Sequence, residues 1–414
     1  MMKIIEKKYY PWVVVALLWV VALLNYMDRQ MLSTMQTSMK ADIHELNQAE
    51  AFGALMAVFL WVYGLVSPFA GMVADKVNRK WLVVGSLFVW SAVTLAMGYA
   101  TSFNQLYYLR GIMGISEALY IPSALSLLAD WHEGKSRSLA IGIHMTGIYM
   151  GQAIGGFGAV VAALLSWKTA FHWFGIIGIV YALVLGMLLH EKPSHGQTLN
   201  VAAQKTAPKA SLLSGFGVVL SNWVFWVILF FFAVPSLPGW ATKNWLPTLF
   251  AQNLGIPMEE AGPISTITIA ASSFLGVILG GSLSDWWVKR HLKGRVYTSA
   301  IGLGMTIPAL VLLGYGHHLS AIVGAGLLFG VGYGMFDANN MPILCQFISA
   351  KQRATAYGIM NMTGVFAGAA VTQVFGKWTD GNQLGAGFAL LGGIVALALV
   401  AQLCFLKPKT DNME

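Results

Sequence analysis

The chain carries little charge and almost no cysteine. Asp, Glu, Lys and Arg make up 10% of its 414 residues, whereas a soluble protein carries about 25%. Its two cysteines, Cys345 and Cys404, both lie in apolar runs, which argues against a disulfide framework and against a cysteine metal cluster. The sequence contains no Walker motif, no HExxH motif and no G-x-S-x-G motif. These absences argue against ATP-driven activity within the chain and against an enzyme.

The sequence is instead rich in long apolar runs. Hydrophobic residues make up 57% of the chain, and a membrane-spanning helix needs about 20 consecutive apolar residues. The runs are unbroken rather than alternating, so we predict an all-α membrane protein and not a β-barrel. We expect twelve transmembrane helices at residues 11–36, 50–74, 80–100, 104–130, 136–165, 169–190, 217–249, 260–284, 296–316, 320–347, 353–377 and 383–406.

The spans divide into two sets of six. We predict an N-terminal bundle at residues 1–190, a polar linker at 191–216 and a C-terminal bundle at 217–414. The first apolar run follows Lys3, Lys7 and Lys8, as in a signal peptide, but no small-residue cleavage site follows it. We therefore interpret this run as a retained first span.

The basic residues predict an orientation. Most of the 25 Lys and Arg residues fall in segments on the same side as the amino terminus, which indicates that both termini are cytoplasmic. The exceptions are Arg29 and Arg110 within spans, and Lys40, Lys168, Lys243 and Lys377 on the other side. Basic cytoplasmic loops account for the net charge of +8 without a nucleic-acid partner. Short loops and the lack of a targeting segment favour a bacterial inner membrane.

Three sequence blocks occur twice, in the same order, at offsets of about 210 to 220 residues. They are Gly71-x-x-x-Asp75-x-x-x-Arg79-Lys80 with Gly281-x-x-x-Asp285-x-x-x-Lys289-Arg290, Gly114-x-x-Glu117-x-x-x-x-Pro122 with Gly334-x-x-Asp337-x-x-x-x-Pro342, and Lys135-x-Arg137-x-x-Ala140-x-Gly142 with Lys351-x-Arg353-x-x-Ala356-x-Gly358. Three ordered matches indicate a duplication. Six spans is an even number, so the halves are parallel repeats related by a pseudo-twofold axis along the membrane normal.

The duplicated Gly/Asp/Arg loop and the layout of six plus six spans resemble the major facilitator superfamily over essentially the whole chain. Within that superfamily the chain is most similar to the anion:cation symporter family, on the residues Asp28-Arg29, Arg110-Gly111, Gly114, Glu117, Trp245-Leu246-Pro247-Thr248 and Gly358-Ile359-Met360-Asn361. Val66 and Asn78 depart from the sugar-acid members and, with Asn25-Tyr26-Met27-Asp28-Arg29, also resemble the spinster family of lysolipid and sphingolipid transporters. The resemblance implies the major facilitator fold and a monomer in the lipid bilayer. It also implies symport of a small organic anion with protons, or alternatively sodium, and no cofactor.

Ionisable residues inside spans are the strongest functional signal, because burying an unpaired charge in a membrane costs several kcal/mol. Arg110 and Glu117 are seven residues apart and so lie on one helix face, about 10 Å apart along the axis. Asp28 and Arg29 are adjacent and point in different directions. We expect Asp28 to pair with Arg110 and Arg29 to pair with Glu117, forming a proton-sensitive network. The alternative is a static lattice of ion pairs, and the resemblance places the coupling protons on Asp28 and Glu117.

Other polar residues within spans are candidates for substrate contacts. The resemblance implies a substrate contact at Asn361, and Tyr63 and Gln152 could face a central cavity. His144 could relay a proton or bind an anion, or form a plain interhelical hydrogen bond. Asp337 occupies the position that matches Glu117 in the repeat. It could touch substrate or carry a second proton, or it could repair the backbone gap left by Pro342.

The two copies of the loop motif predict a gate. Their Asp and Arg residues can pair with neighbouring helix ends and hold the cytoplasmic side shut. The predicted gating residues are Gly71, Asp75, Arg79, Gly281, Asp285 and Arg290. Glycines recurring every four residues in the fifth span predict close helix packing, and these are Gly147, Gly151 and Gly155.

The sequence leaves three function classes to distinguish: an organic-anion symporter, a spinster-like lipid transporter, and an intramembrane enzyme or receptor. The duplication favours alternating access over catalysis. Polar groups such as Ser265, Thr266 and Asn361 in the cavity would favour the anion, and a cavity of Phe and Met would favour the lipid. Lys243 could attract an anion or mark the outer end of its span, and we favour the latter. The substrate and the coupling ion are not determined by the sequence.

Overall fold

The computed structural model describes residues 9–132, 135–192, 219–349 and 352–411, and every element in these ranges is helical. The first half contains α2 (Tyr10–Thr34), α3 (Gln36–Lys40), η1 (His44–Asn47), α4 (Ala49–Lys76), α5 (Arg79–Met97), α6 (Phe103–Ala118), α7 (Tyr120–Trp131), α8 (Lys135–Gly155), α9 (Gly158–Leu164) and α10 (Trp167–Leu188). The second half contains α13 (Trp223–Leu254), α14 (Met258–Val288), α15 (Gly294–Tyr315), α16 (Leu319–Asp337), α17 (Asn340–Phe347), α18 (Arg353–Asp380) and α19 (Leu384–Phe405).

The described residues contain 11 spans that are long and apolar enough to cross a membrane, and a bent pair of helices supplies a twelfth. That pair is α8 and α9, which meet at 42°. Two other predicted spans, 104–130 and 320–347, each consist of two consecutive helices, α6 with α7 and α16 with α17. The prediction of an all-α membrane protein is confirmed.

Two prolines explain why these two spans are interrupted. A proline lacks the N–H that would bond to the carbonyl four residues earlier. Pro122 therefore leaves the carbonyl of Ala118, the last residue of α6, without its usual partner, and Pro342 does the same to Ala338, directly after α16. Because the two prolines are related by the sequence repeat, the two halves contain the same break.

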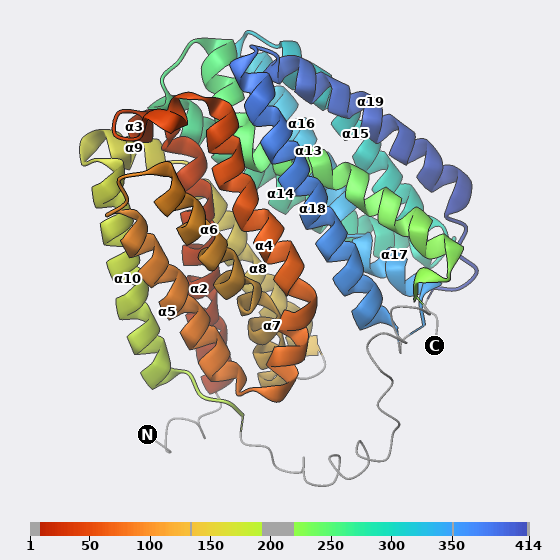
Figure 1. Cartoon of the computed structure of the whole chain (residues 1–414). Coiled ribbons are helices and arrows are strands. Elements are labelled where there is room, and N and C mark those ends of the chain that lie inside the picture. The colour runs from red at the N-terminus through yellow and green to blue at the C-terminus, as the bar shows by residue number, and fades with distance from the viewer. Residues whose placement is uncertain (1–8, 133–134, 193–218, 350–351, 412–414) are drawn as a thin grey trace.

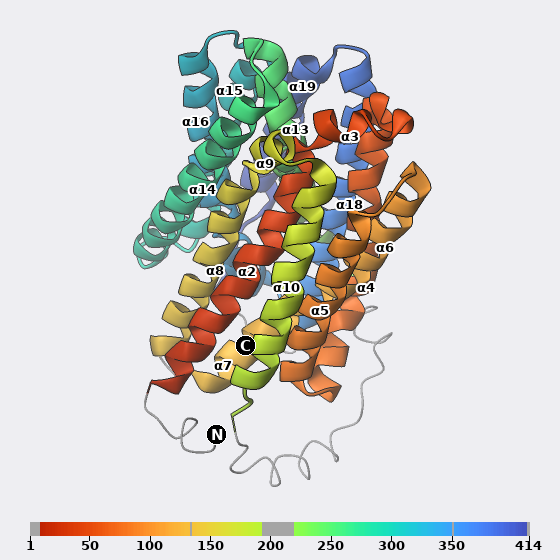
Figure 2. The same cartoon turned by 90° about the vertical axis from the view of Figure 1, so that its left-hand side faces the viewer.

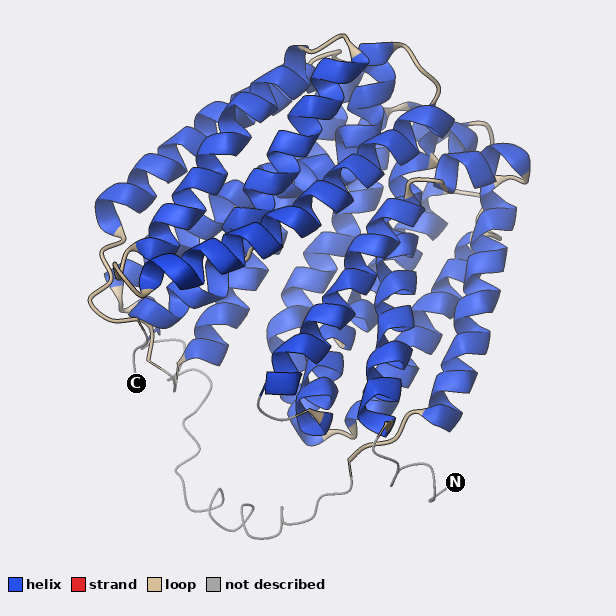
Figure 3. Ribbon diagram, turned by 180° about the vertical axis from the view of Figure 1, so that it is seen from behind, coloured by secondary structure: helices blue, strands red, loops and turns tan. Residues whose placement is uncertain are grey.

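The arrangement of the helices shows two bundles, one built from α2 to α10 and the other from α13 to α19 (Figures 1 and 2). The bundles pack together at one end of the molecule and lean apart toward the end at which α2 begins and α19 ends, as the view from behind also shows (Figure 3). We call these the closed end and the terminal end. Residues 193–218, which hold most of the predicted linker, lie outside the described residues, so the boundaries at 190 and 217 stay a prediction.

Glycines bring α8 very close to α2. A Cβ atom added to Gly151 would lie 2.4 Å from the carbonyl oxygen of Leu23, and one added to Gly147 would lie 2.7 Å from that of Trp19. Real side chains do not approach backbone oxygen this closely, so these positions require glycine while the helices keep their spacing. Small residues at such a spacing are the usual means of close helix packing in membranes.

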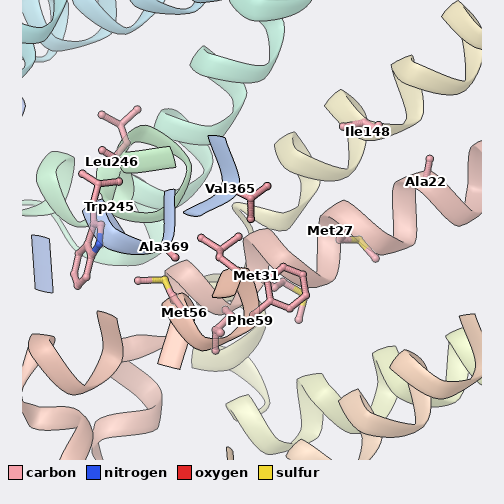
Figure 4. Close-up of a cluster of buried hydrophobic side chains, with 14 of the residues drawn as sticks. Ala22, Met27, Met31, Met56, Phe59, Ile148, Trp245, Leu246, Val365 and Ala369 are labelled. Carbon is pink, nitrogen blue, oxygen red and sulfur yellow. The ribbon is translucent and has the colours of Figure 1, made fainter. Parts of the chain in front are cut away.

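An apolar cluster joins the two bundles. Figure 4 shows buried side chains from α2, α4 and α8 of one bundle with residues of α13 and α18 of the other. Phe59, Trp245 and Leu246 are each no more than 1% exposed. These three side chains are thus desolvated, and the cluster helps to hold the bundles together.

Polar contacts seal the closed end. The carboxylate of Asp380, the last residue of α18, accepts hydrogen bonds from the backbone N–H groups of Ala49 at 2.7 Å and Glu50 at 2.8 Å. These are the first two residues of α4, whose free N–H groups and positive dipole end favour an anion. Lys377 Nζ also lies 3.1 Å from Glu50 Oε1. Residues of one bundle therefore cap and neutralise a helix end of the other.

The repeat predicted from sequence extends to single hydrogen bonds. Arg137 donates to the carbonyl oxygens of His132 at 3.2 Å and Ala129 at 3.2 Å. Arg353 donates to the carbonyl oxygens of Ile348 at 3.2 Å and Cys345 at 3.3 Å. These three residues are the repeat equivalents of Arg137, His132 and Ala129, so the same hydrogen bonds occur in both halves. Both arginines satisfy carbonyl groups at the end of a short helix, α7 or α17, which is a favourable place for a cation.

Candidate substrate and proton site

A buried ion pair joins α2 to α6. Arg29 Nε donates to Glu117 Oε2 at 2.5 Å, and the Glu117 side chain is completely buried. The guanidinium of Arg29 also lies over three rings, 4.7 Å from the centre of Phe59 and 4.9 Å from the centres of Tyr26 and Tyr63. Such contacts strengthen when the cation is desolvated. The predicted pairing of Arg29 with Glu117 is thus present.

The predicted pairing of Asp28 with Arg110 is wrong. Asp28 instead contacts α5, where its Oδ2 lies 2.5 Å from the hydroxyl of Thr94. Arg110 lies 4.6 Å from the ring centre of Phe59 and donates to the sulfur of Met113 at 3.1 Å. A hydroxyl group can satisfy a buried carboxyl without a second charge, and the sequence offered no means of recognising Thr94 as that partner.

Three connected cavities lie between the bundles. The widest, about 630 Å³, is lined from α8, α13, α14, α16, α17 and α18, including Tyr149, Phe274, Asp337 and Asn361. It shares Tyr149 and Asp337 with a middle cavity of about 100 Å³. The middle cavity shares Gln152 and Lys243 with a small void of about 10 Å³ toward the closed end.

The share of polar residues among those that line the cavities rises with depth. The wide cavity is lined mostly by apolar side chains, such as Phe232 and Ile278. The deepest void is lined by more polar residues than apolar ones, namely Gln30, Gln152, Thr242, Lys243, Ser265 and Thr266 against Leu246, Pro247 and Ile269. A site with a few convergent polar groups within an apolar surround is typical of small-molecule recognition.

Three of the predicted substrate residues line these cavities and two do not. Gln152, Asp337 and Asn361 face them. Tyr63 is absent from the described linings and its ring packs on Arg29 and on Phe59. His144 is fully buried behind the cavity wall, with its ring 6.0 Å from that of Tyr120.

Asp337 is also not the residue that repairs the break at Pro342. Its Oδ1 accepts a hydrogen bond from Asn340 Nδ2 at 3.1 Å, whereas Asn339 Nδ2 donates to the carbonyl oxygen of Met335 at 2.8 Å. Asn339 thus satisfies a carbonyl group in the last turn of α16, and Asp337 stays in the wall of both larger cavities.

Lys243 lies well inside its helix, not at the end where we placed it. Helix α13 continues to Leu254, so Lys243 is 11 residues, or about 16 Å, from its last residue. Gly255 ends the helix with a φ of 63°, and Pro257 follows two residues later. A glycine followed closely by a proline is a common helix stop, so this signal could have located Lys243 from sequence.

The predicted gating residues make local contacts at the terminal end. Arg79, at the start of α5, forms an ion pair with Asp130 of α7. In the second half, Asp285 lies 3.9 Å from Arg295, and the guanidinium of Arg290 lies 4.2 Å from the ring centre of Trp286. A Cβ added to Gly281 would meet no atom of another helix within 4 Å. For Gly71 and Asp75 the structure describes only the backbone, as part of α4.

Comparisons with known proteins support this architecture. The Major Facilitator Superfamily model matches residues 18–372 and 268–413. The chain is 25% identical to the "Probable galactarate/D-glucarate transporter GarP" of Escherichia coli K12 over 95% of this chain and 94% of that protein. It is 24% identical to the hexuronate transporter of Bacillus subtilis 168, again over 95% and 94%.

A solved structure has the same fold. The bacterial homolog of the lysosomal transporter Spinster, crystallised inward-facing and unoccupied, superposes with a TM-score of 0.76 at 20% identity, covering 99% of this chain and all of that one. At this identity the similarity shows the fold alone. With a family model matching most of its length, the chain belongs to the Major Facilitator Superfamily and is a membrane transporter, not an enzyme.

Proposed function

We propose that this chain is a proton-coupled symporter of a small organic anion of the sugar-acid class, working by alternating access. The observation that carries the proposal is the polar depth of the central cavity, which Lys243 and Gln152 line together with Tyr26, whose ring packs on Arg29 of the buried pair with Glu117. The names of the similar GarP and hexuronate transporters favour the same substrate class.

The two bundles supply the alternating access. In the described structure the cavities widen toward the terminal end, and Asp380 and Lys377 hold the closed end together. The positive-inside distribution assigns the terminal end to the cytoplasm of a bacterial inner membrane, with both termini inside. The structure then corresponds to an inward-facing state, and rocking of the bundles around the cavity would expose the other side.

The contacts of Asp28 favour a role in carrying a proton. The Thr94 hydroxyl oxygen lies 2.5 Å from the Asp28 carboxyl oxygen and 3.0 Å from the carbonyl oxygen of Trp90. The hydroxyl has only one hydrogen to donate. A carbonyl can only accept a hydrogen bond. Both contacts are satisfied when Asp28 is protonated and donates to Thr94, while Thr94 donates to Trp90. The inward-facing geometry therefore suits a neutral Asp28.

Glu117 is the second proton carrier in this proposal. In the described state its carboxylate is held by Arg29, and a fully desolvated charge pair is stable only while both partners remain in place. Protonation of Glu117 removes one charge and frees Arg29, so movement of α2 against α6 and protonation of Glu117 are linked. Asp28, on the same helix as Arg29, responds to the same movement.

Uptake into proteoliposomes with an alkaline interior tests this function. We expect the pH gradient to drive accumulation of galacturonate, galactonate or galactarate by the wild type. Glu117→Gln and Asp28→Asn should retain exchange but lose accumulation, whereas Glu45→Gln, an exposed carboxylate at the closed end, should behave as the wild type. Accumulation that both buried variants retain would contradict the proton network.

A second candidate is transport of a lysolipid. The wide cavity favours it, because apolar side chains such as Phe232, Phe274 and Met341 make up most of its lining. Lysolipids are therefore included in the uptake panel, and movement of lysolipids without any sugar acid would replace the anion proposal with this one.

A further inference from the structure

The three cavities contain a single pair of opposite charges. Among the described residues that line them, Lys243 is the one cation and Asp337 the one anion. Both line the middle cavity of about 100 Å³, Lys243 from α13 and Asp337 from the end of α16. Arg29 and Arg110 are absent from the described linings, and the guanidinium groups of both pack on the ring of Phe59.

Lys243 is held in place but forms no close ion pair among the described residues, and the opposite charge in the same cavity is Asp337. Its backbone carbonyl accepts a hydrogen bond from Gln30 Nε2 of the other bundle at 2.8 Å, and its ammonium lies 4.8 Å from the ring centre of Trp240. None of the ion pairs among the described residues includes Lys243. A cation in a polar cavity with its hydrogen-bonding capacity left open is a site for an anion.

We propose that Lys243 binds the carboxylate of the substrate and that Asp337 selects for substrates with one carboxylate. This inference rests on the proposed function and deepens it by naming the recognised group. A sugar acid bound to Lys243 extends past Gln152 and Tyr149 toward Asp337. Hydroxyl groups can donate hydrogen bonds to Asp337, whereas a second carboxylate there is repelled.

The consequence is a preference for uronates or aldonates over aldarates. Galacturonate carries one carboxylate and galactarate carries one at each end; galactonate, which is open-chain like galactarate but carries one carboxylate, separates the effect of charge from that of ring shape. Galactose is the neutral counterpart of galacturonate, since it has the same hydroxyl pattern and no carboxylate. Specificity of this kind combines an attractive contact with a repulsive one.

Calorimetry on the purified full-length protein tests the proposal by measuring how tightly each sugar binds. We expect the wild type to bind galacturonate more tightly than galactose or galactarate. Lys243→Gln should weaken galacturonate binding about tenfold to a hundredfold, the usual loss for a charged hydrogen bond, and should remove the preference over galactose. Lys243→Arg should restore much of that preference. Lys168→Gln, at a lysine that instead pairs with Asp42 within one bundle, should bind like the wild type.

The role of Asp337 is tested separately. Asp337→Asn should strengthen binding of galactarate relative to galacturonate by at least about tenfold, because the repulsion is removed. Wild-type protein that binds galactarate as tightly as galacturonate would overturn the role of Asp337.

A measurement without any substitution guards against variants that fail to fold. Lysine acylation of the wild type, followed by mass spectrometry, should show that galacturonate protects Lys243 and leaves Lys168 unprotected. Equal modification of Lys243 with and without saturating galacturonate, or unchanged binding by Lys243→Gln, would overturn the role of Lys243 and leave the proposed function intact. If the wild type binds no sugar acid at all, both the proposed function and this inference fail.

Discussion

Removing the Asp380 carboxylate should open the closed end of the molecule. In Asp380→Ala, the N–H groups of Ala49 and Glu50 lose an anionic acceptor from the other bundle. Loss of a helix-capping side chain costs about 0.5–2 kcal/mol, and loss of a charge at a helix N-terminus costs about 0.3–1 kcal/mol. The exposed pair of Lys377 with Glu50 remains but contributes little. We take the total as about 1–2 kcal/mol, which raises the population of the open form about 5- to 30-fold.

Cysteine labelling measures that population directly. Thr372 is fully buried in α18, and its carbonyl oxygen would lie 2.9 Å from a Cβ added to Gly53 of α4. In a background with Cys345 and Cys404 replaced by serine, Thr372→Cys should react with a maleimide only when the bundles separate. The labelling rate then scales with the open population, and Asp380→Ala should raise it about 5- to 30-fold.

Asp42→Ala is the matched control for this prediction. Asp42 also lies near the closed end, but it contacts Lys168 and Trp167 of its own bundle. Its loss should leave the labelling rate of Thr372→Cys unchanged. A rate that stays within twofold of the parent in Asp380→Ala would refute the capping argument, and an equal rise in both variants would indicate general loosening instead of opening at this contact.

Two further predictions concern helix packing and pH. Gly151→Leu should prevent α8 from packing on α2, because even a Cβ would lie 2.4 Å from the Leu23 carbonyl oxygen. In a thermal-shift assay we expect a loss of thermal stability of several degrees or no folded protein. A melting temperature equal to that of the wild type would contradict the packing. Hydrogen bonds from Lys168 and Trp167 lower the pKa of Asp42. The ionised carboxylate therefore adds stability that is present above its unfolded pKa of about 3.9 and is lost as pH falls through the lower folded value. Asp42→Asn should melt below the wild type at pH 7 and approach it below about pH 4, so a difference between the two that is constant across this range would contradict the shift.

Much of the architecture follows from local properties of the sequence. Apolar runs must form helices in a membrane because no water satisfies their backbone. The breaks at Pro122 and Pro342 follow from a missing N–H group, and the equivalent arginines Arg137 and Arg353 follow from the duplication. These features depend on residues near one another in the chain, so the residue pattern predicts them.

Contacts between distant helices were decided by the tertiary structure. The charges of Arg29 and Glu117 made their pairing predictable, because two opposite intramembrane charges on neighbouring spans have few other partners. The partner of Asp28 was not predictable, because many hydroxyl groups were available and only packing of α2 on α5 selects Thr94. Likewise, Gly255 and Pro257 indicate from the sequence where α13 ends, but only the packing of the two bundles shows that Lys243 lines a cavity.

Composition and pattern thus determined that the chain forms membrane helices in two related halves, because the bilayer and the duplication act on each half by itself. Only the tertiary structure decided which polar groups meet between the halves. The lining of the cavity and the capping of α4 by Asp380 join residues that are far apart in the chain. Their proximity depends on how the two bundles pack, and neither bundle determines that alone.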